Sequence, residues 1–406
     1  MTDSENRVSA DAAVSQSANT GAAHELGAPA RNGAVDLLRI VFSILVILFH
    51  SANVLALVGV SPRIVPSGYL AVEFFLIVSG WLLTAKAAKN KNPNVWNADL
   101  SMLRGKLLHL FPFIFVATVF SNIFSFIGDY FGSSIFLVDF VGKRLVYTVS
   151  ELLGLQMLGF DGFWATGTVW FISALLASSF IIYPFLIKRR EAFTKYFAPI
   201  AALFIYGYIS HEWQTLADPG TWETFVYRGL VRAFAGICVG CCAYELTSWL
   251  NKSSVRRSTV FLLESCGSVA VILFCIFYRG SAESATGAFF VPPILFLTVS
   301  ALFSEKSVLS RAIKGKAFTF LGQFSLSTYL NHFYVDKFIK VMAGYFTSDA
   351  QMLTVYFLLI VVLSVLNYAL GSLLAKKMTV RLMVILCCVI VLLGCAALIA
   401  AKIIVA

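Results

Sequence analysis

Charged residues are scarce in this chain. Only 13% of its 406 residues are Asp, Glu, Lys or Arg, whereas 59% are hydrophobic and 15% are aromatic. Too few polar side chains remain to cover a soluble surface of this size, and the mean hydropathy of +0.83 agrees with this. The composition therefore excludes a soluble globular protein and predicts an all-α, polytopic bundle of membrane helices.

The chain also lacks the cysteine pattern of a metal site. Its eight cysteines all fall in apolar stretches, and none is joined to a histidine or carboxylate at metal-ligand spacing. We interpret them as small apolar packing residues and expect no metal and no tightly bound cofactor.

We expect no signal peptide in the N-terminal segment. The first thirty residues contain no basic segment followed by an apolar run. Residues 1–30 are therefore predicted to be a disordered cytoplasmic tail. No soluble domain is evident elsewhere, so any catalytic apparatus must lie in the membrane unit.

Apolar stretches predict about ten or eleven membrane spans. We expect them at 37–58, 68–85, 107–127, 167–187, 196–211, 228–248, 259–278, 286–303, 325–345, 351–375 and 382–402. A membrane domain of ten spans would cover 31–375, with an interfacial helix near 145–158, and 376–406 would add one further C-terminal span.

The basic residues fix the expected orientation. Most Lys and Arg residues fall in the short loops that lie on the same side as the N-terminus. The positive-inside rule places that side in the cytoplasm. This distribution accounts for the net charge of +10 without nucleic acid as a partner.

The first span carries an arginine and a histidine that a simple anchor would not need. Arg39 and His50 are eleven residues apart, so in an α-helix they project from one face about 16 Å apart. Asp36 and Ser43 fall on the same stripe. Arg39 can snorkel to the cytoplasmic boundary, but a mid-span histidine needs a partner or a cavity. A general base and a packed histidine bonded to a neighbouring helix both remain open for His50.

This opening resembles that of the acyltransferase-3 family, integral membrane enzymes that move acyl groups onto bacterial surface glycans. The resemblance is carried by the pattern Arg31-x4-Asp36-x2-Arg39-x10-His50. The stretch 67–81 is similar to the family's second-span signature, with Glu73 where the family usually has Asp. Glu73 inside a span fits either an ion pair with an arginine or an orienting role in catalysis.

Three later motifs extend the resemblance in the expected order. Arg104, Lys106 and His109 open the third span and resemble a family basic cluster, which implies contact with the phosphates of acyl-CoA. Trp170 is in a segment similar to one that begins the fourth span. Arg232, near the start of the sixth span, matches a buried arginine of the family pattern.

The last motif lies near the C-terminal end of the resemblance. Ser325, Tyr329 and His332 fall at i, i+4 and i+7, so they share one helix face that could close a cavity opposite the first span. Hydrogen bonds between helices would equally explain Tyr329 and His332. An interfacial aromatic belt would likewise explain Trp170, and ordinary positive-inside charge would explain the basic cluster.

The resemblance implies a transmembrane O-acyltransferase of the bacterial cytoplasmic membrane. Its co-substrate would be acyl-CoA, in particular acetyl-CoA, and its acceptor a hydroxyl of a cell-envelope glycan or a lipid-linked precursor. His50 would act as a base or an acyl carrier, aided by Arg39, with Asp36 or Glu73 to orient and balance charge. The sequence leaves open the acceptor sugar and the oligomeric state. A transporter or flippase of a lipid-linked glycan is the alternative, because it would also need charges inside the membrane.

Overall fold

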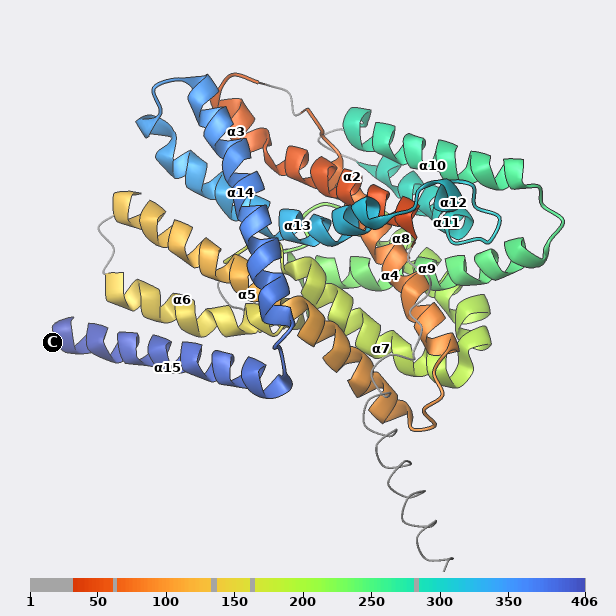
Figure 1. The fold of residues 1–406 in the computed structure, drawn as a ribbon, viewed down its shortest axis with the longest axis horizontal. Helices are drawn as coiled ribbons and strands as arrows, with labels where there is room; N and C mark the ends of the chain where they lie inside the picture. Colours follow the sequence, from red (N-terminus) through yellow and green to blue (C-terminus); the bar gives the residue numbers. More distant parts are fainter. Residues whose placement is uncertain (1–31, 61–63, 133–136, 161–164, 281–284, 406) are drawn as a thin grey trace, which may run out of the picture. The chain divides into compact units, whose positions relative to one another are not determined.

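The computed structural model describes residues 32–60, 64–132, 137–160, 165–280 and 285–405, with no side chains described for 128–140 and 401–405. The tail predicted for 1–30 lies outside the described residues. The elements below all belong to the unit Gly33–Ala406, which Figure 1 shows as a bundle of helices.

Helices make up nearly all of the described first half of the chain. They are α2 (Gly33–His50), α3 (Ala52–Leu57), the 3-10 turn η1 (Gly68–Leu70), α4 (Ala71–Ala88), α5 (Val95–Gly132), α6 (Leu137–Leu152), the 3-10 turn η2 (Gln156–Leu158), α7 (Trp170–Ala192), the π-helical turn η3 (Phe193–Phe197), α8 (Ala198–Tyr208) and the π-helical turn η4 (Ile209–Trp213).

The second half begins with a short hairpin and then returns to helices. Its elements are β1 (Trp222–Glu223), β2 (Val226–Tyr227), α9 (Arg228–Lys252), α10 (Arg257–Phe277), the 3-10 turn η5 (Thr286–Phe290), α11 (Val291–Leu302), α12 (Leu309–Ala312), α13 (Lys316–Met342), the 3-10 turn η6 (Ala343–Tyr345), α14 (Asp349–Ala375) and α15 (Val380–Val405). The strands pair antiparallel, with Trp222 opposite Tyr227.

Eight helical runs of the described chain are long and apolar enough to cross a membrane. They are Gly33–Leu57, Gly68–Ala88, Val95–Ile127, Trp170–Trp213, Arg228–Lys252, Arg257–Phe277, Asp349–Ala375 and Val380–Ala400. Large apolar side chains on these helices remain exposed, as expected of lipid-facing positions; Leu203 and Phe204 of α8 are 76% and 79% exposed. The prediction of an all-α, multi-pass membrane protein is confirmed.

Every stretch predicted to span is largely helical, but four of them have no run of their own among those eight. Predicted spans 167–187 and 196–211 belong to one run of 44 residues, which at 1.5 Å per residue is about twice the bilayer core. Arg189, with φ −143°, kinks this run. Thr286–Leu302 is shorter than the other runs, and α13 carries the polar face predicted from the last motif.

Glycines allow a close crossing between α4 and α9. A Cβ on Gly240 would overlap the carbonyl oxygen of Ile77 and would lie 2.8 Å from the Cα of Gly80. A Cβ on Gly80 would in turn overlap the carbonyl oxygen of Ile237. Small residues at this interface let the two backbones approach closely, and this fixes α4 against α9.

We expect Gly240→Ala to lower the free energy of unfolding by about 1–3 kcal/mol, because the added methyl group forces the two backbones apart. Titration of the micelle-embedded protein with a denaturing detergent would measure the change. Gly207→Ala in α8 is the matched control, since a Cβ there meets nothing within 4 Å. An equal effect of the two substitutions would contradict the close-crossing account.

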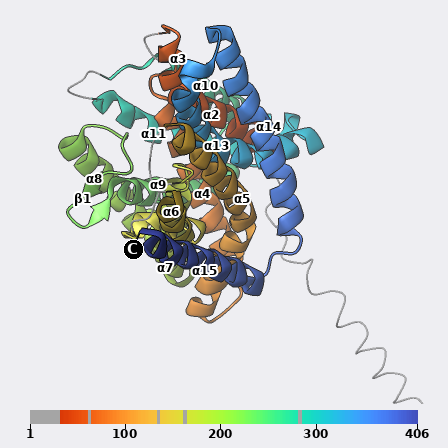
Figure 2. The same ribbon diagram turned by 90° about the vertical axis from the view of Figure 1, so that its left-hand side faces the viewer.

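Two further helix pairs pack closely. α2 packs along α13, which brings together the two stripes predicted from the first and last motifs. α6 and α15 lie side by side in both views (Figures 1 and 2). The helix expected near 145–158 ends at Leu152, because Gly154 adopts a left-handed conformation with φ +66° and redirects the chain toward α7.

Candidate active site

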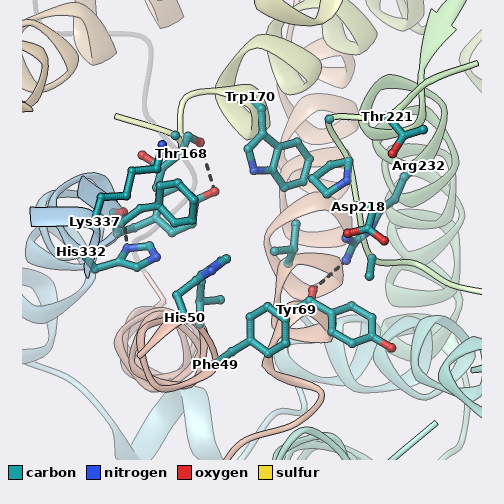
Figure 3. A pocket seen from close by; sticks show the side chains of 18 residues that line it. Phe49, His50, Tyr69, Thr168, Trp170, Asp218, Thr221, Arg232, His332 and Lys337 are labelled. Carbon is teal, nitrogen blue, oxygen red and sulfur yellow. Dashed lines mark hydrogen bonds between the residues drawn. The ribbon is translucent and has the colours of Figure 1, made fainter. Parts of the chain in front are cut away.

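A cavity of about 440 Å³ opens between α2, α9 and α13, large enough for a small organic ligand. Its other walls come from Tyr69 and Val72, from the segment around Gly167 and Thr168, and from residues 217–221. Figure 3 shows His332 and Lys337 on one side and Arg232, Asp218 and Thr221 on the other, with His50 and Trp170 between them.

Two histidines face each other in this cavity. His50 is the last residue of α2, and its ring centroid lies 5.2 Å from that of His332 on α13. The rings of Phe49 and Phe333 meet the His50 ring edge-on at 5.0 and 5.1 Å. The contact between α2 and α13 therefore places two imidazoles, distant in the sequence, beside the rings of two phenylalanines.

The tautomer of His332 follows from its backbone contact. Nδ1 lies 2.7 Å from the carbonyl oxygen of Tyr329, and a carbonyl oxygen only accepts, so Nδ1 carries the proton. Nε2 is then an acceptor, and it is buried without a hydrogen-bond partner among the described residues. An unsatisfied buried acceptor that borders a cavity is suited to a ligand hydroxyl group.

An ion pair closes the opposite side. Arg232 Nε donates to Glu73 Oε1 at 2.7 Å, and the two side chains are only 4% and 0% exposed. The remaining guanidinium nitrogens donate to the carbonyl oxygens of Leu216 (2.6 Å) and Tyr69 (2.8 Å). The Tyr206 hydroxyl donates to the second Glu73 oxygen. Arg232 therefore ties α9 to α4, to η1 and to the segment before the cavity loop.

The loop 217–221 is held at the start of α9. The first two amides of that helix, Arg228 and Gly229, donate to the carbonyl oxygens of Thr221 (3.0 Å) and Pro219 (2.9 Å). Asp218 adopts φ +56° within this loop. The turn places a carboxylate and a threonine hydroxyl on the cavity wall opposite the histidines.

The structure brings together five of the predicted site residues: His50, Trp170, Arg232, Tyr329 and His332 all line the cavity. Glu73 lies behind the wall as the partner of Arg232.

Asp36 and Arg39 form an ion pair with a 3.1 Å separation one helix turn from the start of α2, away from the residues that line the cavity. Here α2 is close to α13, since a Cβ on Gly322 would overlap the Asp36 carboxylate. Ser43 donates to the carbonyl oxygen of Ser325 at 3.4 Å. The predicted stripe thus packs against α13, with the Asp36–Arg39 ion pair at one end of the contact and His50, facing His332, at the other.

The predicted donor-binding residues lie together on the early part of α5, and none of them lines the cavity. Lys106 Nζ donates to the Ser179 hydroxyl on α7 at 2.9 Å. Arg104 and His109 are exposed. Lys86 of α4 interacts electrostatically with Lys106, so a second ammonium group lies in this region.

Sequence reasoning missed several cavity residues. Lys337 follows His332 on the same helix, and its ammonium group lies 4.8 Å above the Phe333 ring. A lysine inside a predicted span was a usable signal for it. Asp218, Pro219 and Gly220 formed a recognisable turn, but a turn signature says nothing of the cavity that it borders. Within the described residues no group of three His, Cys, Asp or Glu could hold a metal.

Fold and cavity together define a polytopic membrane protein with a cavity that is lined by two histidines. The chain belongs to the acyltransferase-3 family, because the family model described as "Acyltransferase domain" matches residues 32–400. The match confirms the resemblance and identifies the chain as an acyltransferase. Neither the curated proteins nor the solved structures give a significant match to the chain.

Proposed function

We propose that this protein moves an acyl group, in particular acetyl, from acyl-CoA to a hydroxyl group of a cell-envelope glycan or its lipid-linked precursor. The observation that carries this proposal is the cavity in which His50 and His332 meet, within a chain that belongs to an acyltransferase family. The cavity volume is suited to a sugar residue.

The two imidazoles divide the proton chemistry in this proposal. The acceptor hydroxyl group donates its proton to His50 as its oxygen attacks the thioester carbonyl carbon. The C–S bond then breaks, and the protonated His50 gives the same proton to the departing thiolate, which leaves as coenzyme A thiol. His332 presents Nε2, an acceptor, toward the same space and stabilises the protonated His50. Arg232 is fully engaged with Glu73 and with two backbone carbonyls, so it shapes the site and does not transfer the proton.

The orientation expected from the positive-inside rule places the early part of α2 near the cytoplasm and His50 toward the outer side. The ion pair between Asp36 and Arg39 and the Lys106 region would then face the compartment that contains acyl-CoA. The stripe on α2 that joins Arg39 to His50 would mark the line along which the acyl group passes from that side to the histidines. We propose the bacterial cytoplasmic membrane as the site of this reaction.

We expect Lys106→Met to raise the KM for acetyl-CoA about tenfold with little change in kcat, because one charge-assisted contact to a donor phosphate is lost. Initial rates at varied acetyl-CoA would show this, and the effect should shrink at high salt. Lys91→Met, an exposed lysine of the preceding loop, is the matched control. A donor KM that is unaffected by Lys106→Met would remove this residue from the donor site.

Mass spectrometry of envelope glycans tests the proposed function. A strain that lacks this gene should lose an O-acyl substituent from one glycan, and the wild-type gene should restore it. An unchanged pattern of O-acylation across the envelope glycans would contradict the proposal.

A further inference from the structure

A second buried carboxylate lies behind the cavity wall. Glu151, in the last turn of α6, is fully buried, and both of its carboxylate oxygens accept hydrogen bonds. Oε2 accepts from the backbone amide of Ala165 at 2.9 Å. Oε1 accepts from the amide of Thr166 at 3.0 Å and from the Thr166 hydroxyl. Three hydrogen bonds from two consecutive residues to one side chain make a strong clamp on this backbone.

The clamped backbone leads directly into the cavity wall, to which Gly167 and Thr168 belong. Gly167 adopts φ +70°, and a Cβ there would overlap the Phe333 ring. The carbonyl oxygen of Thr168 accepts a hydrogen bond from the Tyr329 hydroxyl at 3.2 Å. The Thr168 hydroxyl donates to the carbonyl oxygen of Leu330 at 3.5 Å. The position of residues 165–168 therefore sets the distance between this wall and α13.

Charges of opposite sign surround the clamp. Arg144 and Lys337 both interact electrostatically with Glu151, and Lys337 itself lines the cavity. The Ser121 hydroxyl donates to the carbonyl oxygen of Ala165, which holds the same peptide from its other side. These interactions fix the backbone from α5 and α6 together, before it reaches α7.

We propose that Glu151 is a positioning residue that holds residues 165–168 against α13 and so keeps the cavity in the shape that binds the acceptor beside His50 and His332. Its role in acceptor binding rests on the function proposed above. The clamp itself is a property of the fold and can be tested without activity.

The chain offers a chemically matched control in Glu264 of α10. It is also fully buried, and it accepts from two consecutive backbone amides, Val308 and Leu309, both at 2.9 Å, and from the Ser307 hydroxyl. It clamps a loop that does not line the cavity. Glu264→Gln therefore removes the same kind of interaction as Glu151→Gln, at a place where no effect on the acceptor is expected.

Hydrogen exchange in nanodiscs tests the clamp. Glu151→Gln should speed exchange of the Ala165 and Thr166 amides about 10- to 100-fold, because one acceptor oxygen becomes a donor. Glu264→Gln should speed exchange at Val308 and Leu309 and leave Ala165 and Thr166 as in the wild type. Unchanged exchange at Ala165 and Thr166 in Glu151→Gln, or equal acceleration there in both variants, would overturn the proposal.

Kinetics test the positioning role, with radiolabelled acetyl-CoA as donor and an envelope glycan fraction from the gene-deletion strain as acceptor. Glu151→Gln should raise the acceptor KM about tenfold or more and leave the acetyl-CoA KM unchanged, whereas Glu264→Gln should alter neither. Faster exchange with an unchanged acceptor KM would overturn the positioning role. A wild-type protein that transfers no acetyl group would refute the proposed function, and the exchange data would still decide the clamp.

If Glu151→Gln does not assemble, Thr166→Val is the milder test. It removes the hydroxyl donor to Glu151 and keeps both backbone amides. A smaller acceleration of exchange at Ala165 and Thr166 is expected, of about threefold to tenfold, and wild-type exchange at both amides would count against the clamp.

Discussion

Replacement of His50 with alanine is expected to lower the rate of acyl transfer by about 10²–10⁴-fold, the usual contribution of a positioned general base. The reason is its place in the cavity, 5.2 Å from the His332 ring and enclosed by two phenylalanine rings. In the gene-deletion strain, a plasmid copy with His50→Ala should leave the O-acyl content of envelope glycans at the deletion level, as measured by mass spectrometry.

His211→Ala is the matched control for this experiment. The His211 side chain is 86% exposed and pairs with Glu212 at 2.9 Å, outside the cavity lining. A plasmid copy with His211→Ala should therefore restore the O-acyl content of the envelope glycans in full. Full restoration by His50→Ala, at wild-type levels of membrane-inserted protein, would remove His50 from the reaction.

Arg232→Ala is expected to destabilise the protein by about 3–5 kcal/mol, because it leaves the charge of Glu73 buried without its partner. The guanidinium group also loses its bonds to Leu216 and Tyr69, which join three parts of the cavity wall. Titration with a denaturing detergent would measure the free energy of unfolding. The double variant Glu73→Gln with Arg232→Met should recover part of the loss, since neither charge remains.

A nearby ion pair supplies the control. Arg228 pairs with Glu223, and their side chains are 20% and 30% exposed, against 4% and 0% in the Arg232–Glu73 pair. Arg228→Ala should therefore cost only about 1 kcal/mol or less, as for partly solvated pairs. If Arg228→Ala and Arg232→Ala lower the free energy of unfolding by similar amounts, burial does not explain the importance of the Arg232–Glu73 pair.

The helices and the two polar stripes could be predicted from the sequence because each depends on local periodicity. Arg39 and His50 share a face of α2 through their spacing, and Tyr329 and His332 do so on α13. His50, Tyr329 and His332 meet in one cavity because α2 and α13, nearly 300 residues apart, pack together, and only the ordered family motifs could suggest this.

The partners of buried charges could not be assigned in the same way. Glu73 was expected to form an ion pair with an arginine or to orient a catalytic group, but its partner, Arg232, lies far along the chain on a helix fixed by the crossing at Gly80 and Gly240. Glu151 gave no signal at all, because its donors are backbone amides whose direction depends on the turn after α6.

Transfer of a labelled acetyl group by the purified protein tests the central claim most directly. The protein in nanodiscs would be given radiolabelled acetyl-CoA and an envelope glycan fraction from the gene-deletion strain. The account predicts alkali-labile label in the glycan with wild-type protein and none above background with His50→Ala. If correctly folded wild-type protein leaves acetyl-CoA intact and the glycan unlabelled, the acyltransferase account is contradicted.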